Sequence, residues 1–176
     1  MIIQTFSLSD LKNKKIFNTN DPYFNFRNMP YRKQLDEIQK VHHETERVLI
    51  NKITSTLELI ITDNNSPEYM HFYNDFIITA QELNEHFKKE EQVVFPLMYI
   101  HASYDRETID HLNSMTNEHR DQENRNKSLQ NFLHIFDAPC YSSLRRSLQD
   151  FFSDVSIHIT KEDEITFPNY IDLVTN

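Results

Sequence analysis

The segment HFKKEEQVVFP at residues 86–96 is matched by HITKEDEITFP at residues 158–168. Both copies follow the pattern H-x-x-K-E-acidic-x-aliphatic-x-F-P. Within each copy the His and the first Glu are four positions apart, so they lie on one face of a helix, one turn apart. A His nitrogen and a Glu oxygen in this arrangement can bind one metal ion, or two ions that share the carboxylate, inside a helical bundle. The repeat therefore predicts two similar helical hairpins packed around a shared site.

Four long helices are predicted around these two segments, with expected ranges of about 30–62, 67–101, 105–137 and 142–168. Residues that favour turns and helix starts bound them: Pro30, a polar turn that ends at Pro67, and Pro139 followed by two serines. In the last range His158 and Glu162 belong to a series of residues spaced by three and four, which indicates a face directed at a partner helix. The predicted fold class is all-α, an antiparallel up-down four-helix bundle with a short N-terminal arm.

Two parts of the chain are expected, an N-terminal arm at residues 1–29 and the bundle at residues 30–176. Within the arm, the stretch from Ser9 to Phe17 is a candidate for a short helix. The aromatic segment at residues 22–26 is expected to pack on the bundle. With 176 residues, 38% hydrophobic and 12% aromatic, the chain is long and apolar enough for one folded domain.

Composition excludes several classes of function. A formal net charge of −9 disfavours nucleic acids and anionic membranes as partners. The sequence has no glycine, so it lacks the glycine-rich loops that bind nucleotide phosphates. Cys140 is the single cysteine, which rules out an intramolecular disulfide and fits a reducing compartment. No signal peptide or membrane-spanning run is apparent, and the expected location is the cytoplasm.

Helix register places one histidine of each predicted helix at a common level. His43 and His86 lie about 21 residues on either side of the first turn, His86 and His119 about 16 or 17 from the second, and His119 and His158 about 19 or 20 from the third. At about 1.5 Å per residue, neighbouring histidines agree in height to a few ångströms. Glu90 and Glu162 follow one turn further along. The sequence thus predicts a layer of histidines beside a layer of carboxylates.

The alternative interpretation is that these residues lie on solvated faces, or are core histidines satisfied by hydrogen bonds. The alignment of all four favours a metal centre. Imidazole and carboxylate donors without thiolate suit iron or manganese, and zinc less selectively. Residues 117–128 contain no apolar side chain, which fits either an exposed helix or an opening beside His119.

Periodicity leaves two choices open. In the first helix, His42 lies slightly nearer the centre of the apolar face than His43 does. In the third helix, Glu118 and Glu123 both flank His119. Glu123, one turn away, is a tentative further metal ligand or a solvent-facing residue. Glu118 is a candidate proton acceptor beside the metal ligands.

These motifs resemble the hemerythrin-like (HHE cation-binding) domains over about residues 31–170. More narrowly, they resemble the group called RIC, repair of iron centres, which are di-iron proteins that repair iron–sulfur clusters. The matching pieces are HHETER at 42–47, HFKKEEQVVFP at 86–96, EHRDQE at 118–123 and HITKEDEITFP at 158–168.

The resemblance implies a centre of two iron ions, bridged by two glutamates and an oxo or hydroxo group. It selects His43 over His42, because His43 precedes Arg47 by four positions as in that group. The implied metal ligands are His43, His86, Glu90, His119, His158 and Glu162. Oxygen-carrying hemerythrins have a histidine where this chain has Glu123, which argues against a simple oxygen carrier. The better-known RIC proteins also carry an N-terminal domain with paired cysteines, and this sequence has no such pair.

The function implied is a cytoplasmic di-iron protein that protects or repairs iron–sulfur clusters under nitrosative or oxidative stress, by donating iron or handling nitric oxide. Its expected partners are iron, nitric oxide, oxygen and damaged iron–sulfur proteins. The alternative is a sensor or buffer that binds iron or oxygen without catalysis. Whether the chain is an enzyme stays open.

Overall fold

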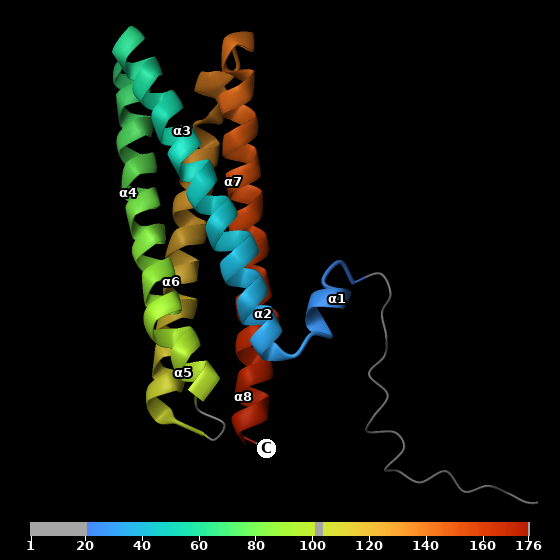
Figure 1. The fold of residues 1–176 in the computed structure, drawn as a ribbon. Coiled ribbons are helices and arrows are strands. Elements are labelled where there is room, and N and C mark those ends of the chain that lie inside the picture. Colours follow the sequence, from blue (N-terminus) through green and yellow to red (C-terminus); the bar gives the residue numbers. More distant parts are fainter. Residues whose placement is uncertain (1–20, 101–103, 176) are drawn as a thin grey trace, which may run out of the picture.

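The structure, a computed structural model, describes residues 21–100 and 104–175, and all the secondary structure in these ranges is helical. The candidate helix between Ser9 and Phe17 lies outside the described residues. Figure 1 shows the helices packed as an elongated bundle. The α-helices are α1 (Phe24–Arg27), α2 (Tyr31–Glu37), α3 (Glu44–Asp63), α4 (Pro67–Lys89), α5 (Phe95–Ile100), α6 (Arg106–Asn131), α7 (Ser142–Lys161) and α8 (Phe167–Thr175).

The long helices α3, α4, α6 and α7 run alternately up and down the bundle (Figure 1). Helix α4 packs against α3 and α6, and α7 packs against α3 and α6. Two of these helices begin at a residue whose side chain caps the first turn. The Ser66 hydroxyl accepts a hydrogen bond from the Tyr69 amide (3.3 Å), and the Asp105 carboxylate accepts one from the Thr108 amide (2.9 Å). No helix in the described ranges is long and apolar enough to cross a membrane.

Three π-helical turns interrupt the helical runs: η1 (Ile38–His43), η2 (Glu90–Val94) and η5 (Glu162–Thr166). Each turn begins or ends at a predicted site residue, namely His43, Glu90 or Glu162. A π-turn accommodates an extra residue within an otherwise continuous helix and is frequent at functional sites. The described chain therefore divides into more helical elements than the four expected, although α2 continues into α3, α4 into α5, and α7 into α8.

The last helix is longer than the sequence indicated. It was expected to end near Pro168, but α8 continues to Thr175. Proline lacks the backbone N–H and normally clashes with the carbonyl four residues earlier, which ends an α-helix. Here the π-turn directly before Phe167 changes that backbone register, and Pro168 falls in the first turn of the new α-helical segment, where proline is tolerated. The third helix is shorter than expected, because α6 ends at Asn131 and a 3₁₀-helix, η3 (Leu133–Phe136), follows.

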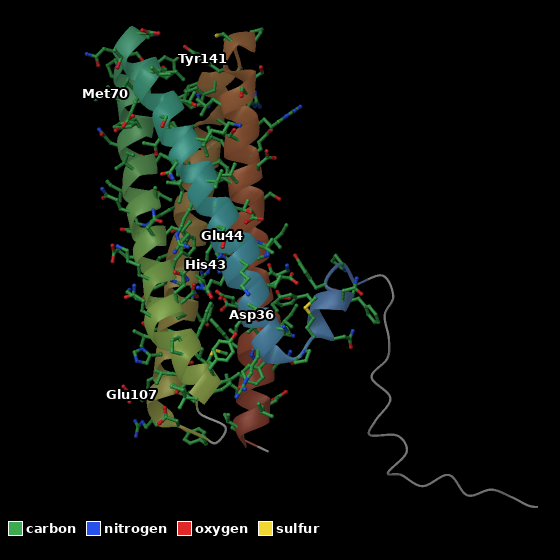
Figure 2. All side chains as sticks on the ribbon, viewed as in Figure 1. Asp36, His43, Glu44, Met70, Glu107 and Tyr141 are labelled. Carbon is green, nitrogen blue, oxygen red and sulfur yellow. The ribbon has the colours of Figure 1, made fainter. Side chains whose placement is uncertain are left out.

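Two apolar clusters form the core, one toward each end of the bundle. One includes Phe72, Phe76, Phe87 and Phe151, and the other includes Tyr170. In Figure 2, Met70 and Tyr141 mark one end of the bundle, Glu107 the other, and His43 lies between them. The described part of the N-terminal arm packs on the second cluster through Phe26, which is 4% exposed. A second 3₁₀-helix, η4 (Pro139–Tyr141), precedes α7.

Candidate metal centre

Six buried residues meet between the two apolar clusters, and none of these residues is more than 5% exposed as a whole. They form two groups, in each of which the four ligand atoms lie within 4.8 Å of one another. Both glutamates belong to both groups, whereas each histidine belongs to one. The first group is His43, His158, Glu90 and Glu162, and the second is His86, His119, Glu90 and Glu162. We call these six residues the inner layer.

The histidines direct their Nε2 atoms at the two carboxylates. Glu90 presents its Oε2 to His43 Nε2 at 3.2 Å and its Oε1 to His86 Nε2 at 3.1 Å. The Oε2 of Glu162 faces His119 Nε2 at 3.1 Å and His158 Nε2 at 3.2 Å. With its two oxygens Glu90 thus contacts one histidine of each group. Glu162 contacts the other histidine of each group through its Oε2.

These spacings fit metal coordination. Two donor atoms about 2.1 Å from one ion and at right angles to each other lie about 3.0 Å apart. The two Nε2 atoms of His86 and His119 are 3.0 Å apart. Several inner-layer atoms are buried without a hydrogen-bond partner, which is costly for polar groups. They are Nε2 of His43 and of His158, and both oxygens of Glu90 and of Glu162. A pair of cations would satisfy all of them.

A second set of four carboxylates surrounds the inner layer, one at the Nδ1 of each histidine. Such carboxylates hold the imidazole in the tautomer that turns its Nε2 lone pair to a metal, and they raise its basicity. The pairs are His43 with Glu91 (2.8 Å), His86 with Glu118 (3.2 Å), His119 with Asp163 (2.9 Å) and His158 with Glu46 (3.2 Å). We call Glu91, Glu118, Asp163 and Glu46 the orienting carboxylates.

Three of the orienting carboxylates have no role in the sequence-based prediction. Glu91 and Asp163 occupy the same position of the internal repeat, the acidic residue directly after the predicted ligand. Each pairs with a histidine of a different helix, Glu91 with His43 and Asp163 with His119. Because both copies of the repeat have an acidic residue at this position, the sequence offered a signal for these two orienting carboxylates. Glu46 gave no comparable signal, because its partner is 112 positions away.

The structure places the two glutamates that flank His119 differently. Glu118 accepts one hydrogen bond from Lys89 Nζ at 2.9 Å and lies beside His86, next to the candidate metal ligands. Glu123, the tentative further ligand, belongs to neither group of ligand atoms and pairs with Lys127 on the surface of α6 at 3.5 Å. The reason is that Glu123 lies one turn beyond His119, toward the end of the bundle away from Glu90.

His42 lies next to the inner layer but is not part of it. Its Nδ1 is 3.1 Å from Asp154, and its Nε2 is 2.9 Å from Lys161 Nζ. The His42 ring stacks on that of His158, with centroids 5.8 Å apart. The structure therefore brings His43 to the two carboxylates and gives His42 separate partners. Glu46, His42 and Asp154 make a third, separate group of potential ligand atoms.

Opposed charges shift the pKa values of this buried region. Burial lowers the pKa of His86, but Glu90 and Glu118 outweigh burial and raise it to about 10. Burial is likewise outweighed at His119, where Asp163 and Glu162 raise the pKa to about 9. The hydrogen bond to His86 outweighs desolvation and lowers the pKa of Glu118 to about 2. Without metal, protons on His86 and His119 therefore balance the negative charge of the neighbouring carboxylates.

One further buried polar atom in the described ranges lacks a partner, the Oγ1 of Thr166. Thr166 is 0% exposed and lies one turn after Glu162, at the end of η5. Its counterpart in the repeat is Val94, which is also 0% exposed. Buried Thr79, by contrast, donates to the Asp75 carbonyl at 2.8 Å.

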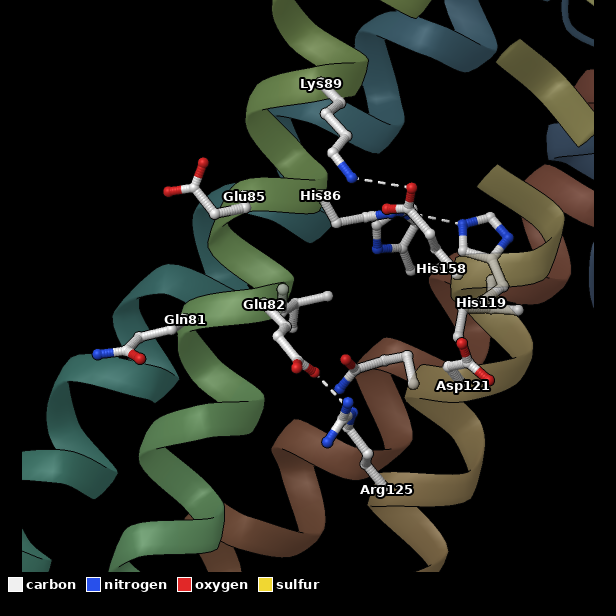
Figure 3. A pocket seen from close by; sticks show the side chains of 13 residues that line it. Gln81, Glu82, Glu85, His86, Lys89, His119, Asp121, Arg125 and His158 are labelled. Carbon is white, nitrogen blue, oxygen red and sulfur yellow. Dashed lines mark hydrogen bonds and ion pairs between the residues drawn. The ribbon is translucent and has the colours of Figure 1, made fainter. Parts of the chain in front are cut away.

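A cavity of about 420 Å³ lies between α4 and α6 and is lined by His86, His119 and His158. Figure 3 shows these rings at its inner end, with charged side chains of α4 and α6 around it. Of the two alternatives for residues 117–128, an opening beside His119 corresponds to this cleft, which meets the inner layer.

Comparison with known proteins agrees with this geometry. No curated protein shows significant sequence similarity to the chain. The model of the family described as hemerythrin HHE cation binding domain matches residues 34–170. This range contains the whole inner layer and all four orienting carboxylates, and it covers well over half of the sequence. The two groups of buried His and Glu residues could each hold a metal ion, which fits a cation-binding domain. The chain therefore belongs to the hemerythrin HHE cation-binding domain family.

Proposed function

We propose that the inner layer holds two iron ions within a hemerythrin-like up-down four-helix bundle at residues 30–176. His43 and His158 would bind one ion, His86 and His119 the other, and Glu90 and Glu162 would bridge them. The observation that carries this proposal is that both carboxylates belong to both groups of ligand atoms. A mixed nitrogen and oxygen donor set without thiolate suits iron, and manganese or zinc less well.

We infer that the protein protects or repairs iron–sulfur clusters under nitrosative or oxidative stress, by donating iron or handling nitric oxide. Sequence resemblance to the RIC group supports this inference. The donor count supports it too, since each group offers four ligand atoms and an iron ion commonly accepts six. Bound iron would supply redox chemistry and positions for a small diatomic such as nitric oxide or oxygen.

The chain's own residues prepare the site for that chemistry. The orienting carboxylates fix the imidazole rings, which limits the motion of the donor atoms when the ions change charge. The apolar clusters on either side of the layer shield it from solvent toward both ends of the bundle, which leaves the cleft between α4 and α6 as its opening. Glu118 accepts a hydrogen bond from the Nδ1 of His86 and is partly exposed in the cleft, and its pKa of about 2 keeps it ionised there at neutral pH.

The test is metal analysis of the purified protein with an optical spectrum. Protein loaded aerobically with iron should contain two irons per chain and show a ferric charge-transfer band, and the reduced protein should react with nitric oxide. Replacement His119→Ala should remove the band, whereas Glu123→Gln should retain it. A colourless protein that takes up no iron would refute the proposal.

Repair and buffering are separated by a second measurement. The reduced protein should consume nitric oxide catalytically, or restore a damaged cluster enzyme beyond what the released iron explains. If iron binds and leaves only in stoichiometric amounts, the function is that of a sensor or buffer. If elemental analysis of the purified protein finds no metal, the chain is instead a structural helical protein.

A further inference from the structure

The two halves of the inner layer, one with His43 and His158 and the other with His86 and His119, differ in their access to solvent. The 420 Å³ cavity between α4 and α6 is lined by both histidines of one half, His86 and His119 (Figure 3). Of the other half, His158 lines the cavity and His43 does not. The side chain of His43 is 0% exposed, whereas that of His86 is 7% exposed. Both histidines of one pair therefore line the cleft, whereas only one histidine of the other pair does.

Aromatic rings and buried charges enclose the half that contains His43. The His43 ring stacks on Phe87, with centroids 4.3 Å apart, and on Phe95, with centroids 5.9 Å apart. Its orienting carboxylate, Glu91, is held by Arg47 at 2.9 Å, and the Arg47 guanidinium lies over the Phe87 ring. His158, the other histidine of this half, is paired with the orienting carboxylate Glu46, which is fully buried. An ion in this half would be surrounded by packed side chains.

Polar, partly exposed side chains line the cleft beside His86 and His119. The Glu118 side chain, which orients His86, is 31% exposed and lines the cavity. At the other side of the cavity Arg125 of α6 pairs with Glu82 of α4 at 2.6 Å, so this ion pair spans the cleft. Both partners are more than two-fifths exposed. An exposed ion pair of this kind contributes little stability and can open readily.

The charges around the cavity favour cations. Its lining has four carboxylate side chains and two cationic ones, apart from the histidines: Glu82, Glu85, Glu118 and Asp121 against Lys89 and Arg125. A cleft with an excess of one charge raises the local concentration of ions of the opposite charge. At its inner end the cleft meets His86 and His119, whose Nε2 atoms are 3.0 Å apart. Carboxylates thus lead from solvent to metal-binding nitrogen atoms.

We propose that the cleft between α4 and α6 is the exchange route for a divalent cation, and that the two metal positions exchange unequally. The ion between His86 and His119 enters and leaves through the cleft, while the ion between His43 and His158 is retained. The Glu82–Arg125 pair restricts the route. This inference rests on the proposed di-iron centre and specifies which half of it supplies iron.

The experiment is the removal of ferrous iron from the fully loaded, reduced protein by excess water-soluble chelator, followed by rapid-mixing absorbance. The expected result is two phases, each releasing one iron per chain. Arg125→Met should accelerate the fast phase and leave the slow phase unchanged. Arg106→Met is the matched control, since Arg106 is also on α6 but pairs with Asp110 away from the cleft, and it should alter neither phase.

Two variants of orienting carboxylates identify which half of the inner layer releases its iron in each phase. Glu118→Gln should accelerate the fast phase, and Glu91→Gln the slow phase, each by about 10- to 100-fold, which is the usual effect of such residues on metal binding. Release of both irons in one phase, the opposite assignment of the two variants, or an unchanged fast phase in Arg125→Met would overturn the exchange route. An iron content below two per chain before mixing would instead refute the di-iron centre, and with it the basis of this inference.

Discussion

Replacement Asp163→Asn tests whether the orienting carboxylates act on the metal through histidine. Asp163 Oδ1 lies 2.9 Å from His119 Nδ1 and accepts a hydrogen bond of 2.9 Å from Thr116. Asparagine has the same shape and keeps an acceptor oxygen, but it loses the charge. Hydrogen bonds to a charged group contribute about 1.5–3 kcal/mol and neutral ones about 0.5–1.5 kcal/mol. The expected loss is about 1.4 kcal/mol, or roughly tenfold in affinity for the ion at His119.

The assay is competition for metal against a chromophoric chelator, with zinc as a redox-inactive probe beside iron. Glu164→Gln is the matched control, because Glu164 is the adjacent residue and is exposed. This substitution removes the same charge without changing a partner of His119. Urea denaturation of both metal-free variants checks that folding is unaffected. Equal losses of affinity in the two variants would show a general charge effect, and no loss in Asp163→Asn would refute the proposed role of the carboxylate.

Three further results are expected. His43→Ala should remove iron from one half of the centre, while His42→Ala should retain two irons per chain, as measured by metal analysis; the reverse result would exclude His43 as the ligand. Thr166→Val should stabilise the metal-free protein by about 1–2 kcal/mol in urea denaturation, because it replaces an unpartnered buried hydroxyl with the group present at Val94; destabilisation would reveal a partner for that hydroxyl. Iron binding at pH 8 should release protons, because His86, with a pKa of about 10 in the metal-free protein, must lose its proton to bind metal. Apparent affinity should therefore rise with pH up to about 10, and titrations in buffers of different ionisation enthalpy would detect the protons; an affinity independent of pH between 7 and 9 would contradict this charge balance.

The same protonation also affects the metal-free fold. Raised pKa values mean that the folded state binds protons more tightly than the unfolded state does. The contribution of His119, with a pKa of about 9, is therefore fully present below its ordinary value of 6.5 and is lost as pH rises through 9. Metal-free protein should be less stable at pH 10 than at pH 6, whereas bound metal would remove this dependence.

Helical spacing was sufficient to predict the level at which one histidine of each long helix lies, but it did not choose between His42 and His43. A helix rises by a constant amount per residue, so the levels of His43, His86, His119 and His158 follow from their distances to three turns. The four-residue step from His to Glu likewise places Glu90 on the face that carries His86. Regular geometry of this kind needs no knowledge of tertiary contacts.

Other features depend on contacts that spacing does not describe. The π-turns at Glu90 and Glu162 depend on local backbone hydrogen bonding, so the sequence pattern suggested an end at Pro168 where the helix continues. The partners of Glu46 and Asp163 are on other helices, and their pairing requires the rotation of each helix about its own axis. The choice between His42 and His43 depends on the same rotation, because η1 changes the register of the chain just before α3.

The orienting pairs join stretches of chain that are far apart, 112 positions for Glu46 and His158 and 48 for His43 and Glu91. Once metal fixes these histidines, the centre closes long loops between four helices, as a covalent cross-link would. Cross-links that close loops of about 100 residues strongly restrict the unfolded chain. Cys140 is the single cysteine of the sequence, so the chain has no disulfide within itself to serve this purpose. The melting temperature of the protein would then be set by how fully its metal positions are occupied, and would report the iron supply of its surroundings.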